Sequence, residues 1–277
     1  MSDTRQSSRQ TLSVIIITRD EEDRIGRCLE SVKALADEII VLDSGSTDRT
    51  LEIVAAYTDK YFSTDWPGYG VQKQRALAKA QCDWVLSIDA DEALDREMQR
   101  WVVDFQMQDQ RDLVGVKLPW GVTVYGKRLD YGRSARAPLR LVKRKDASFS
   151  DARVHEELRT SPGRVVTAGG RLLHYTSRDY GHALEKNVRY SWLSSQKYFD
   201  DGRRCHSLLR ALLQSWWVFF LVFVIRRGFL DGPVGFLVAV NYAQASFNKY
   251  AGLWTLTREE KTAARRQDQA PPTDGTD

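Results

Sequence analysis

The sequence predicts an α/β fold, a doubly wound and largely parallel sheet followed by a C-terminal helical extension. Three short runs of mainly apolar residues carry this prediction: LSVIIIT (12–18), EIIVL (38–42) and DWVLSI (83–88). Continuous apolar runs of this length are typical of strands that are covered on both faces, as in a parallel sheet. Helical segments separate the runs, and strands that alternate with helices form right-handed βαβ crossovers.

The three intervening segments are expected to be helices. The first has apolar residues at helical spacing from Ile25 to Leu35, and the second has them from Leu51 to Ala55. The third segment, 71–80, is rich in alanine, the best helix former. Each run is therefore separated from the next by at least one helix that can cover one face of the sheet.

The pattern changes beyond residue 110. From 111 to 176 shorter strand-like runs are broken by Gly and Pro, which favours antiparallel additions to the sheet edge, where a second substrate can bind. Three helical stretches follow, near 180–199, 205–226 and 231–255. The expected division is a disordered tail (1–10), an α/β domain (11–178) with a donor half (11–110) and an acceptor half (111–178), a helical membrane-associated extension (179–257) and a polar tail (258–277).

Composition narrows the class of protein. The 277 residues are 42% hydrophobic and 28% charged, which is ordinary for a chain that buries a core, and a net charge of +4 does not indicate a nucleic-acid partner. Three widely spaced cysteines without a CxxC pair predict neither a disulfide framework nor a zinc site. With no apolar signal-peptide core near the N-terminus, we expect a protein of the cytosolic side.

Acidic and turn-forming residues follow all three predicted strands. The segments are TRDEE (18–22), DSGSTD (43–48) and DADE (89–92). The carboxyl ends of parallel strands meet at one edge of the sheet, which is where ligands bind in such folds. We therefore interpret the three segments as one site.

Asp89 and Asp91 are the first candidates for metal chemistry. If the strand continues through them, both carboxylates lie on one face, about 7 Å apart along the chain. They would repel each other, and a hard divalent cation such as Mg²⁺ or Mn²⁺ removes that cost. Glu92 would position the turn. The alternative is a solvated acidic turn that opens a helix near residue 94.

Two other segments offer donor contacts. Asp43 ends its strand where a carboxylate can accept hydrogen bonds from a base or ribose. In PGYGVQKQRA (67–76) two glycines precede a helix whose first turns carry Lys73 and Arg75, a reasonable contact for a diphosphate. The plainer interpretation is that DSGSTD supplies helix caps and that the basic residues are solvated.

Four motifs together resemble a known enzyme family. VIIITRDEEDRIGRCLESV, EIIVLDSGSTDRT, GYGVQKQRALAKA and WVLSIDADE, in this order and spacing, look like the inverting family 2 glycosyltransferases of the GT-A fold. The most similar subgroup is that of the lipopolysaccharide core β-1,4-glucosyltransferase-like enzymes. The match is strong over 12–95 and looser through RLVKR, VHEEL and GFLDGPVGF.

The resemblance implies roles for individual residues. Thr18, Glu21 and Asp43 would line the nucleotide pocket, Asp89 would approach the ribose, and Asp91, from the DXD motif, would hold the metal that bridges the donor diphosphate. Two positions depart from the family, which often has Asn in place of Asp20 and a second Asp in place of Ser44. The base is normally uracil, so the implied donor is a UDP-sugar, and glucose is the sugar we expect.

An inverting transferase also needs a base for the acceptor hydroxyl. From the resemblance we favour Glu156 in RVHEEL, with His155 as the alternative; ordinary helix-start acids are the plainer interpretation. His174 follows a strand-like run and could reach the metal or the diphosphate. A packed structural histidine is the competing interpretation there.

The C-terminal third predicts peripheral attachment to a membrane. WWVFFLVFVI (216–225) has ten apolar residues before two arginines, which we judge too short to span a bilayer, and 229–240 is broken by Asp, Gly and Pro. Residues 182–257 carry nine Lys and Arg against four Asp and Glu, as expected for helices in an anionic headgroup region. The alternative is a buried core helix with a dimer interface, and oligomerisation through these helices is compatible with either.

The functional prediction is a metal-dependent inverting glycosyltransferase at the cytoplasmic face of the inner membrane. Its donor would be a UDP-sugar and its acceptor a membrane-associated glycolipid, with lipopolysaccharide inner core as the first choice. One alternative is transfer to a polyprenyl phosphate or a peptide, and another is a non-catalytic membrane-associated binding protein of the same fold. A nucleotidyltransferase is disfavoured because TRDEED stands where a glycine-rich basic loop is expected.

Overall fold

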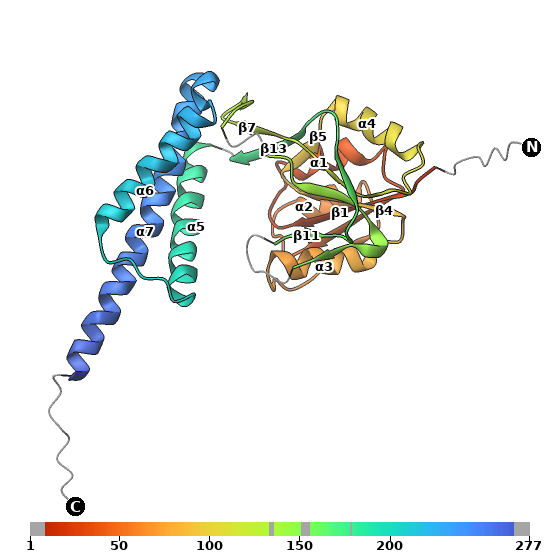
Figure 1. The fold of residues 1–277 in the computed structure, drawn as a ribbon. Coiled ribbons are helices and arrows are strands. Elements are labelled where there is room, and N and C mark those ends of the chain that lie inside the picture. The colour runs from red at the N-terminus through yellow and green to blue at the C-terminus, as the bar shows by residue number, and fades with distance from the viewer. Residues whose placement is uncertain (1–8, 133–135, 151–155, 178, 269–277) are drawn as a thin grey trace, which may run out of the picture. The chain divides into compact units, whose positions relative to one another are not determined.

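A computed structural model describes residues 9–132, 136–150, 156–177 and 179–268 (Figure 1). The chain divides into two compact units. The sheet unit comprises Met1–Thr123 and Ser134–Thr176, and the helical unit comprises Val124–Arg133 and Ser177–Asp277. Residues 124–132, expected in the acceptor half of the α/β domain, thus belong with the C-terminal helices.

The strands, in chain order, are β1 (Leu12–Thr18), β2 (Glu38–Asp43), β3 (Tyr61–Ser63), β4 (Trp84–Asp89), β5 (Glu92–Leu94), β6 (Leu113–Lys117), β7 (Trp120–Val124), β8 (Lys127–Arg128), β9 (Leu139–Lys143), β10 (Ser148–Phe149), β11 (Leu158–Arg159), β12 (Arg164–Thr167) and β13 (Leu172–Ser177). The helices of the sheet unit are α1 (Ile25–Val32), α2 (Thr50–Ala55), α3 (Tyr69–Lys79), α4 (Arg96–Gln106) and the 3₁₀ turn η1 (Arg144–Asp146). Those of the helical unit are α5 (Tyr180–Asp200), α6 (Leu208–Phe220), its π-helical continuation η2 (Leu221–Ile225), the 3₁₀ turn η3 (Gly228–Asp231) and α7 (Gly232–Asp268).

The main sheet confirms the α/β prediction. Its seven strands have the order β12-β6-β9-β4-β1-β2-β3, and β1 pairs in parallel with both β2 and β4. The three predicted strands occupy its centre. The register places Ile17 beside both Leu42 and Asp89, so the chain leaves all three strands at the same edge of the sheet.

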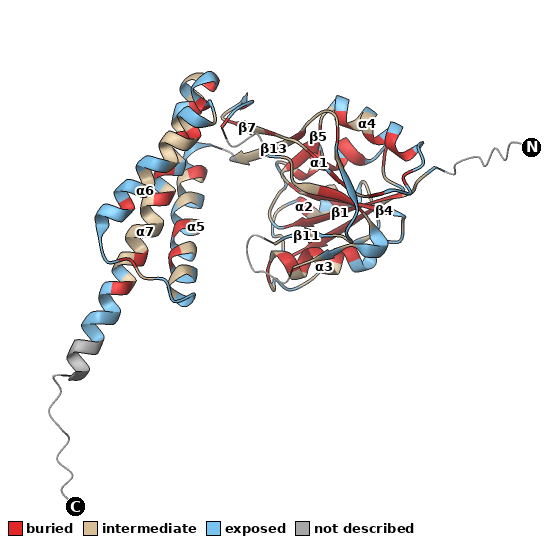
Figure 2. Cartoon of the chain, viewed as in Figure 1, coloured by how far each residue is buried: buried red, intermediate tan, exposed pale blue. Residues whose placement is uncertain are grey.

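Helices cover both faces of this sheet, as the apolar runs require (Figures 1 and 2). On one face Val14 and Ile16 belong to a buried cluster with residues of α1 and α4. On the other face Ile15 and Ile17 pack with Ala76 and Leu77 of α3. Burial of side chains on both faces explains why β1 reads as an unbroken apolar run.

The later strands are more varied than predicted. β9 runs antiparallel to both β4 and β6, as expected for edge additions, but β12 runs parallel to β6. β13 pairs instead with β5, a strand that the sequence did not reveal. The helix expected near residue 94 begins at Arg96, and Asp95 caps it by accepting a hydrogen bond from Met98 N at 2.8 Å.

A ladder of polar contacts joins α5 to α7 in the helical unit. Asn187, Ser191 and Ser195, spaced one turn apart on α5, donate to the backbone oxygens of α7 residues 241, 245 and 249 at 2.7 to 3.1 Å. Close approach is needed there, because a Cβ on Gly252 would lie 2.6 Å from Ser195 Oγ. α7 packs against α6 as well.

Two expectations about chain ends are corrected. α7 continues to Asp268, so residues 258–268 are helical rather than part of a polar tail. Arg204 Nε and Glu260 Oε2 lie 2.6 Å apart, which ties this stretch to the α5–α6 loop. At the other end Gln10 N donates to Gln106 O at 2.8 Å, so residue 10 is not part of a disordered tail.

The expectation that the apolar C-terminal stretch is too short to span a bilayer is wrong. The helix starts at Leu208, well before Trp216, and one helical segment in the described residues, Leu208–Ile225, is long and apolar enough to cross a membrane by length and composition. It has 18 residues with a mean hydropathy of 2.0, and 11% of it is buried. Its outward side is largely exposed (Figure 2).

Candidate active site

The loops that follow β1 and β2 are joined by side-chain hydrogen bonds. Glu21 N donates to Thr50 Oγ1, and Thr47 N donates to Asp20 Oδ1, both at 2.8 Å. Asp20 has a φ of 52°, a left-handed conformation that Asn and Asp tolerate better than most residues. Asp in place of the family's Asn therefore preserves this turn.

Asp43 is buried, and its carboxylate accepts hydrogen bonds from the loop that follows it. Its carboxylate accepts hydrogen bonds from Gly45 N and Ser46 N, each at 3.0 Å, and from Ser46 Oγ. Ser44, the second departure from the family, accepts a hydrogen bond from Gln72 of α3 at 3.0 Å. The loop is thus a rigid end of β2 that fixes the Asp43 carboxylate at the sheet edge.

Thr18 and Glu21 lie at the same edge with different surroundings. Thr18 is 5% exposed, and its hydroxyl has no hydrogen-bond partner among the described residues. An unsatisfied buried hydroxyl is unusual in a folded protein, so it is a natural contact for a bound ligand. The Glu21 carboxylate pairs with Arg24, with 2.5 Å between Oε2 and the nearest guanidinium nitrogen.

Asp89 is compensated by two buried cations. Its carboxylate lies 2.7 Å from Lys73 Nζ and 2.9 Å from an Arg140 nitrogen. Burial would raise the pKa of Asp89, but the charges of Lys73 and Arg140 outweigh burial and hold the pKa well below its usual range. The repulsion that we expected between Asp89 and Asp91 is therefore relieved in part by the chain itself.

Glu92 is a core residue and does not initiate a helix. It is 1% exposed; it accepts hydrogen bonds from Asp89 N at 2.9 Å and from Trp120 Nε1 at 3.1 Å. Arg140 pairs with it at 2.7 Å. Glu92 thus holds both the DXD backbone and the arginine that neutralises Asp89, and Asp95 supplies the helix cap.

Asp91 faces a histidine that is distant in sequence. His174 Nε2 lies 3.4 Å from Asp91 Oδ2, and Arg24 lies 3.8 Å from the same oxygen. The antiparallel pairing of β5 with β13 aligns His174 with Glu92 and so brings the imidazole to the motif. Burial lowers the pKa of His174, but the charge of Asp91 overcomes this and raises it above its ordinary value.

Asp91 and His174 could serve as the two protein ligands of a divalent metal ion. No group of three or more His, Cys, Asp and Glu side chains in the described part of the chain is arranged to hold an ion. Mg²⁺ is commonly bound by one or two carboxylates together with substrate phosphates and water, so a partial site suits a metal that arrives with a diphosphate. An imidazole beside the carboxylate makes Mn²⁺ at least as suitable as Mg²⁺.

Lys73 joins the DXD motif to the candidate base. Its ammonium lies 2.7 Å from Glu156 Oε1 as well as 2.7 Å from Asp89 Oδ1. Lys73 is 3% exposed and doubly paired, whereas we had expected a free diphosphate contact. The alternative base, His155, lies outside the described residues.

Arg75 is not part of this cluster. Its guanidinium pairs with Asp65 at 2.7 Å on the surface of α3, and within the described residues no ion pair links it to the acidic edge. Spacing explains the difference, because residues two apart on a helix point in different directions. The expectation that Lys73 and Arg75 act together on the diphosphate therefore finds no support in the geometry.

Arg140 and Arg24 are members of the site that the sequence did not identify. Arg140 lies in β9 between Leu139 and Leu141, and it is 9% exposed. A cation inside a short apolar strand is a recognisable signal, because buried arginines are almost always paired. No such signal marks Arg24, which lies at the start of an ordinary amphipathic helix.

Acidic loops at the carboxyl edge of a mainly parallel sheet place this chain among the α/β proteins that bind their ligands at that edge. Residues 13–151 match the sequence profile of glycosyl transferase family 2. An uncharacterized glycosyltransferase of Rickettsia bellii is 32% identical over 93% of this chain and 90% of its own length. The lipopolysaccharide core biosynthesis glycosyltransferase LpsC of Rhizobium meliloti is 31% identical over 85% of this chain and 89% of its own.

This chain belongs to glycosyltransferase family 2, and it is an enzyme of glycosyl transfer. Among solved structures, glucosyl-3-phosphoglycerate synthase of Mycobacterium tuberculosis in complex with Mg²⁺ and uridine diphosphate is 25% identical, with a TM-score of 0.37, over 49% of this chain and 57% of its own.

Proposed function

We propose that this protein transfers a sugar, with inversion, from a UDP-sugar to a membrane-associated glycolipid. Glucose is the proposed sugar and lipopolysaccharide inner core the proposed acceptor. The observation that carries the proposal is the double ion pair of Lys73, which places the Glu156 carboxylate two short hydrogen bonds away from the DXD residue Asp89. A base beside the metal and nucleoside site is what a single displacement requires.

In this proposal each residue has a separate task. Glu156 takes the proton from the acceptor hydroxyl while that oxygen attacks the anomeric carbon and the UDP leaves from the opposite side. Asp89, kept ionised by Lys73 and Arg140, accepts hydrogen bonds from the ribose. Asp91 and His174 hold Mn²⁺ or Mg²⁺, which when bound offsets the charge that builds up on the departing diphosphate.

The nucleoside half of the site is supported by Thr18, Glu21 and Asp43. Thr18 offers a buried hydroxyl that has no hydrogen-bond partner in the described part of the chain, and the Asp43 carboxylate is fixed by its loop. A carboxylate at this edge can accept a hydrogen bond from the N–H group of a nucleobase, which supports uracil as the proposed nucleobase.

The proposed acceptor follows from the relatives and from the helical unit. LpsC is named for lipopolysaccharide core biosynthesis, and most of this chain aligns with it. Side chains on α6 are exposed although they are large and apolar, including Leu209, Leu213 and Trp216 at 60 to 64%. Such a surface marks an interaction site (Figure 2).

We propose that this surface attaches the protein peripherally to the cytoplasmic face of the inner membrane. Serine and asparagine hydrogen bonds between α5 and α7, with Gly252 at their contact, resemble the packing of helices in lipid. Apolar side chains on the outside and polar contacts inside are the arrangement that a lipid environment favours. A polyprenyl phosphate remains an alternative acceptor at the same surface.

Transfer assays with matched variants test the catalytic proposal. Purified protein is incubated with UDP-glucose and Mn²⁺ and with three acceptors in turn: truncated lipopolysaccharide, a polyprenyl phosphate and a peptide. Glu156→Gln should lower the turnover number by about 10²- to 10⁴-fold and leave UDP binding intact. Asp91→Asn should abolish the Mn²⁺-dependent part of UDP binding measured by calorimetry.

Asp109→Asn is the matched control, because Asp109 is an acid whose ion-pair partner among the described residues is the exposed Arg111. It should behave as the unaltered protein in both assays. A binding protein of the same fold would be favoured by two results together. The unaltered protein would show no detectable transfer with any acceptor, and its affinity for UDP would be the same with and without Mn²⁺.

Flotation with anionic vesicles tests the attachment. The protein should rise with the vesicles at low salt and be released at high salt or by alkaline carbonate, and Leu209→Ser with Leu213→Ser should reduce its flotation. Retention through the carbonate wash would show that Leu208–Ile225 is inserted and not peripheral.

A further inference from the structure

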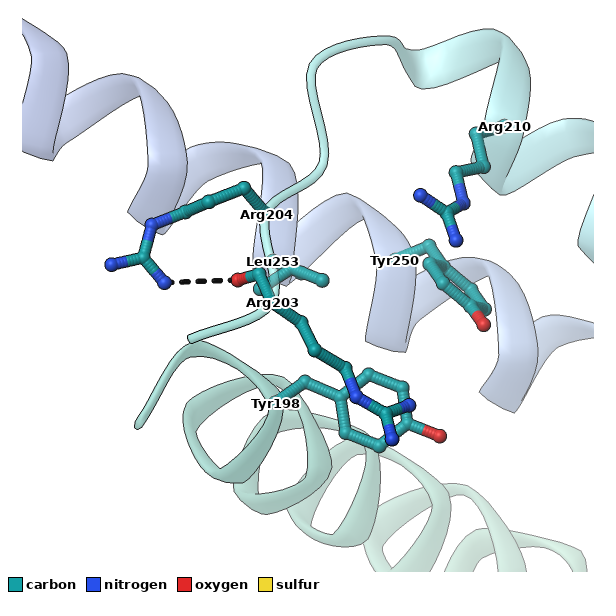
Figure 3. Close-up of a pocket in the computed structure, with 6 residues that line it drawn as sticks. All are labelled: Tyr198, Arg203, Arg204, Arg210, Tyr250 and Leu253. Atoms are coloured by element: carbon teal, nitrogen blue, oxygen red, sulfur yellow. Dashed lines mark hydrogen bonds between the residues drawn. The ribbon is translucent and has the colours of Figure 1, made fainter. Parts of the chain in front are cut away.

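A pocket of about 270 Å³, partly open to solvent, lies in the helical unit, where the end of α5, the α5–α6 loop and the start of α6 meet the middle of α7 (Figure 3). Its lining residues are Tyr198, Arg203, Arg204, Arg210, Tyr250 and Leu253. All six belong to the helical unit, and none is a residue of the candidate active site. Its volume is just below the 300 to 1,000 Å³ typical of sites for drug-sized ligands, so it suits a small group better than a whole sugar nucleotide.

Two tyrosines form the base of this pocket. The rings of Tyr198 and Tyr250 meet edge to face, with 6.2 Å between centroids and 77° between planes. Their helices are fixed by the α5–α7 ladder, whose last contact, from Ser195 Oγ to Lys249 O, lies one turn or less from both rings. The base is therefore rigid.

Three cations surround these rings. The Arg203 guanidinium lies 4.4 Å from the centre of the Tyr198 ring, and that of Arg210 lies 5.6 Å from the centre of the Tyr250 ring. Lys249 Nζ lies 4.7 Å from both centres. Aromatic faces hold the three side chains in place without neutralising them.

These charges lack carboxylate partners. Arg203, Arg210 and Lys249 form no ion pair with any residue that the structure describes, although Asp200 and Asp201 are near in sequence. Arg204 differs from the other two arginines because its guanidinium makes a two-point contact with the Glu260 carboxylate at 2.6 and 2.7 Å. Figure 3 shows Arg204 turned away from the two rings.

We propose that this pocket binds a phosphate group. Convergent cations without counter-ions attract an anion, and arginine forks match the oxygens of phosphate. Arg203 and Arg210, which line the pocket, would each donate to the phosphate oxygens. Lys249 is not a lining residue, but its ammonium, 4.7 Å from both ring centres, would add to the positive field. The ligand class is a phosphomonoester, which can come from an anionic lipid headgroup or from a water-soluble phosphate.

This proposal does not depend on the proposed reaction. It needs no donor, metal or acceptor hydroxyl, and it assigns a function to residues that the transfer chemistry leaves unused. Its position in the unit that carries the exposed α6 surface favours an anionic lipid headgroup as the source, because basic residues near a bilayer are attracted to its anionic lipids.

Calorimetric titration of the full-length protein, without UDP or Mn²⁺, tests the site. The probes are inorganic phosphate, a short-chain phosphatidic acid below its micelle concentration, and the matching phosphatidylcholine, which should not bind. Arg203→Gln with Arg210→Gln should weaken binding by about tenfold or more, the loss expected for charged hydrogen bonds.

Lys186→Gln with Arg189→Gln is the control, since it removes the same charge from exposed positions of α5. This pair should leave the affinity unchanged within about twofold, a shift of a few tenths of a kcal/mol. Circular dichroism verifies that both double variants fold, and Arg203→Gln alone, in an exposed loop, serves if the double variant does not.

The outcomes separate the two sources. Binding of inorganic phosphate that the pocket variant weakens supports a site for the phosphate group itself. Binding of phosphatidic acid alone, again weakened by the pocket variant, supports a lipid source. The proposal is overturned if neither probe binds, or if the pocket pair and the control pair weaken binding equally.

Discussion

Two pairs of cations, one pair in each unit, have opposite surroundings. In the sheet unit Lys73 and Arg140 are buried, and each contacts two carboxylates at 2.7 to 2.9 Å. In the helical unit Arg203 and Arg210 are exposed, each lies near a tyrosine ring, and neither forms an ion pair with a described residue. Lys73 and Arg140 neutralise buried carboxylates within the protein. Arg203 and Arg210 keep an uncompensated positive charge that an anionic ligand could neutralise.

Burial and ion pairing therefore distinguish structural basic residues from ligand-binding ones in this chain. A paired, buried cation is part of the architecture, and removing it leaves carboxylates without compensation. Removing an exposed cation that has no counter-ion changes the free energy of unfolding little, and such a cation is available to bind a ligand. Three substitutions, in descending order of effect on stability, can break or sharpen this contrast.

Arg140→Met should give the largest loss of stability. It leaves Glu92 buried without its cation and leaves Asp89 with Lys73 alone. Breaking a buried ion pair by removing one partner costs about 3 to 5 kcal/mol of unfolding free energy. Urea unfolding measures the loss, and hydrogen exchange of the β4 amides assigns it to the sheet unit.

Arg111→Met is the control for that measurement, because the Arg111 side chain is 85% exposed although it too pairs with a carboxylate. It should leave the unfolding curve unchanged. Adding Glu92→Gln to Arg140→Met should recover part of the loss, since the uncompensated charge is then gone. If the urea unfolding curves of the Arg140 and Arg111 variants are equal, the buried Arg140 is no more important for stability than an exposed arginine, and the contrast between paired buried cations and exposed ones fails.

Glu38→Gln should give an intermediate effect that depends on pH. The buried Glu38 carboxylate accepts hydrogen bonds from Lys60 Nζ and Gln81 N, both at 2.6 Å, and from Ser13 Oγ. Burial raises the pKa of Glu38, but these contacts outweigh it and lower the pKa below 4.5. The loss at pH 7 should be about 1 to 3 kcal/mol, the range for hydrogen bonds to a charged group.

The sign of the pH dependence follows from linkage. Because the native pKa lies below the ordinary one, the unfolded chain takes up the proton first as the pH falls. The stabilisation is therefore complete above pH 4.5 and is lost as the pH falls through the native pKa. Glu30→Gln breaks the surface pair with Lys33, which also lowers the pKa of Glu30, so its pH dependence should have the same sign. Because both side chains are exposed to solvent, the loss at pH 7 and the pH dependence should be much smaller than for Glu38→Gln.

Local sequence was sufficient for the centre of the sheet and for the acidic edge. β1, β2 and β4 follow the predicted runs closely, because each is buried on both faces and each precedes a turn with its own signal. The same pattern predicted that the DXD motif follows the third strand, and β4 ends at Asp89. Short-range pattern predicts well when the residues that create a feature are neighbours in the chain.

Features that depend on distant pairing were harder to predict. His174 reaches Asp91 through the pairing of β13 with β5, and β5 has three residues, too few for a periodic pattern. Arg140 compensates Asp89 only because β9 lies next to β4. Glu92 looked like a helix-start acid because its neighbours are acids, and its true partners come from β7 and β9.

Arg203→Gln with Arg210→Gln should give the smallest change in stability. Cation–π contacts at exposed sites contribute about 0.5 to 1 kcal/mol each, and repulsion among three nearby cations offsets part of that. Hydrogen-exchange mass spectrometry on peptides from 198–212 measures local stability where a whole-chain curve would mix the two units. Because salt screens exposed charges, added sodium chloride should slow exchange there in the unaltered protein more than in the variant. If instead the variant exchanges far faster than the unaltered protein at every salt concentration, these arginines are structural like Arg140, and the contrast between the units fails.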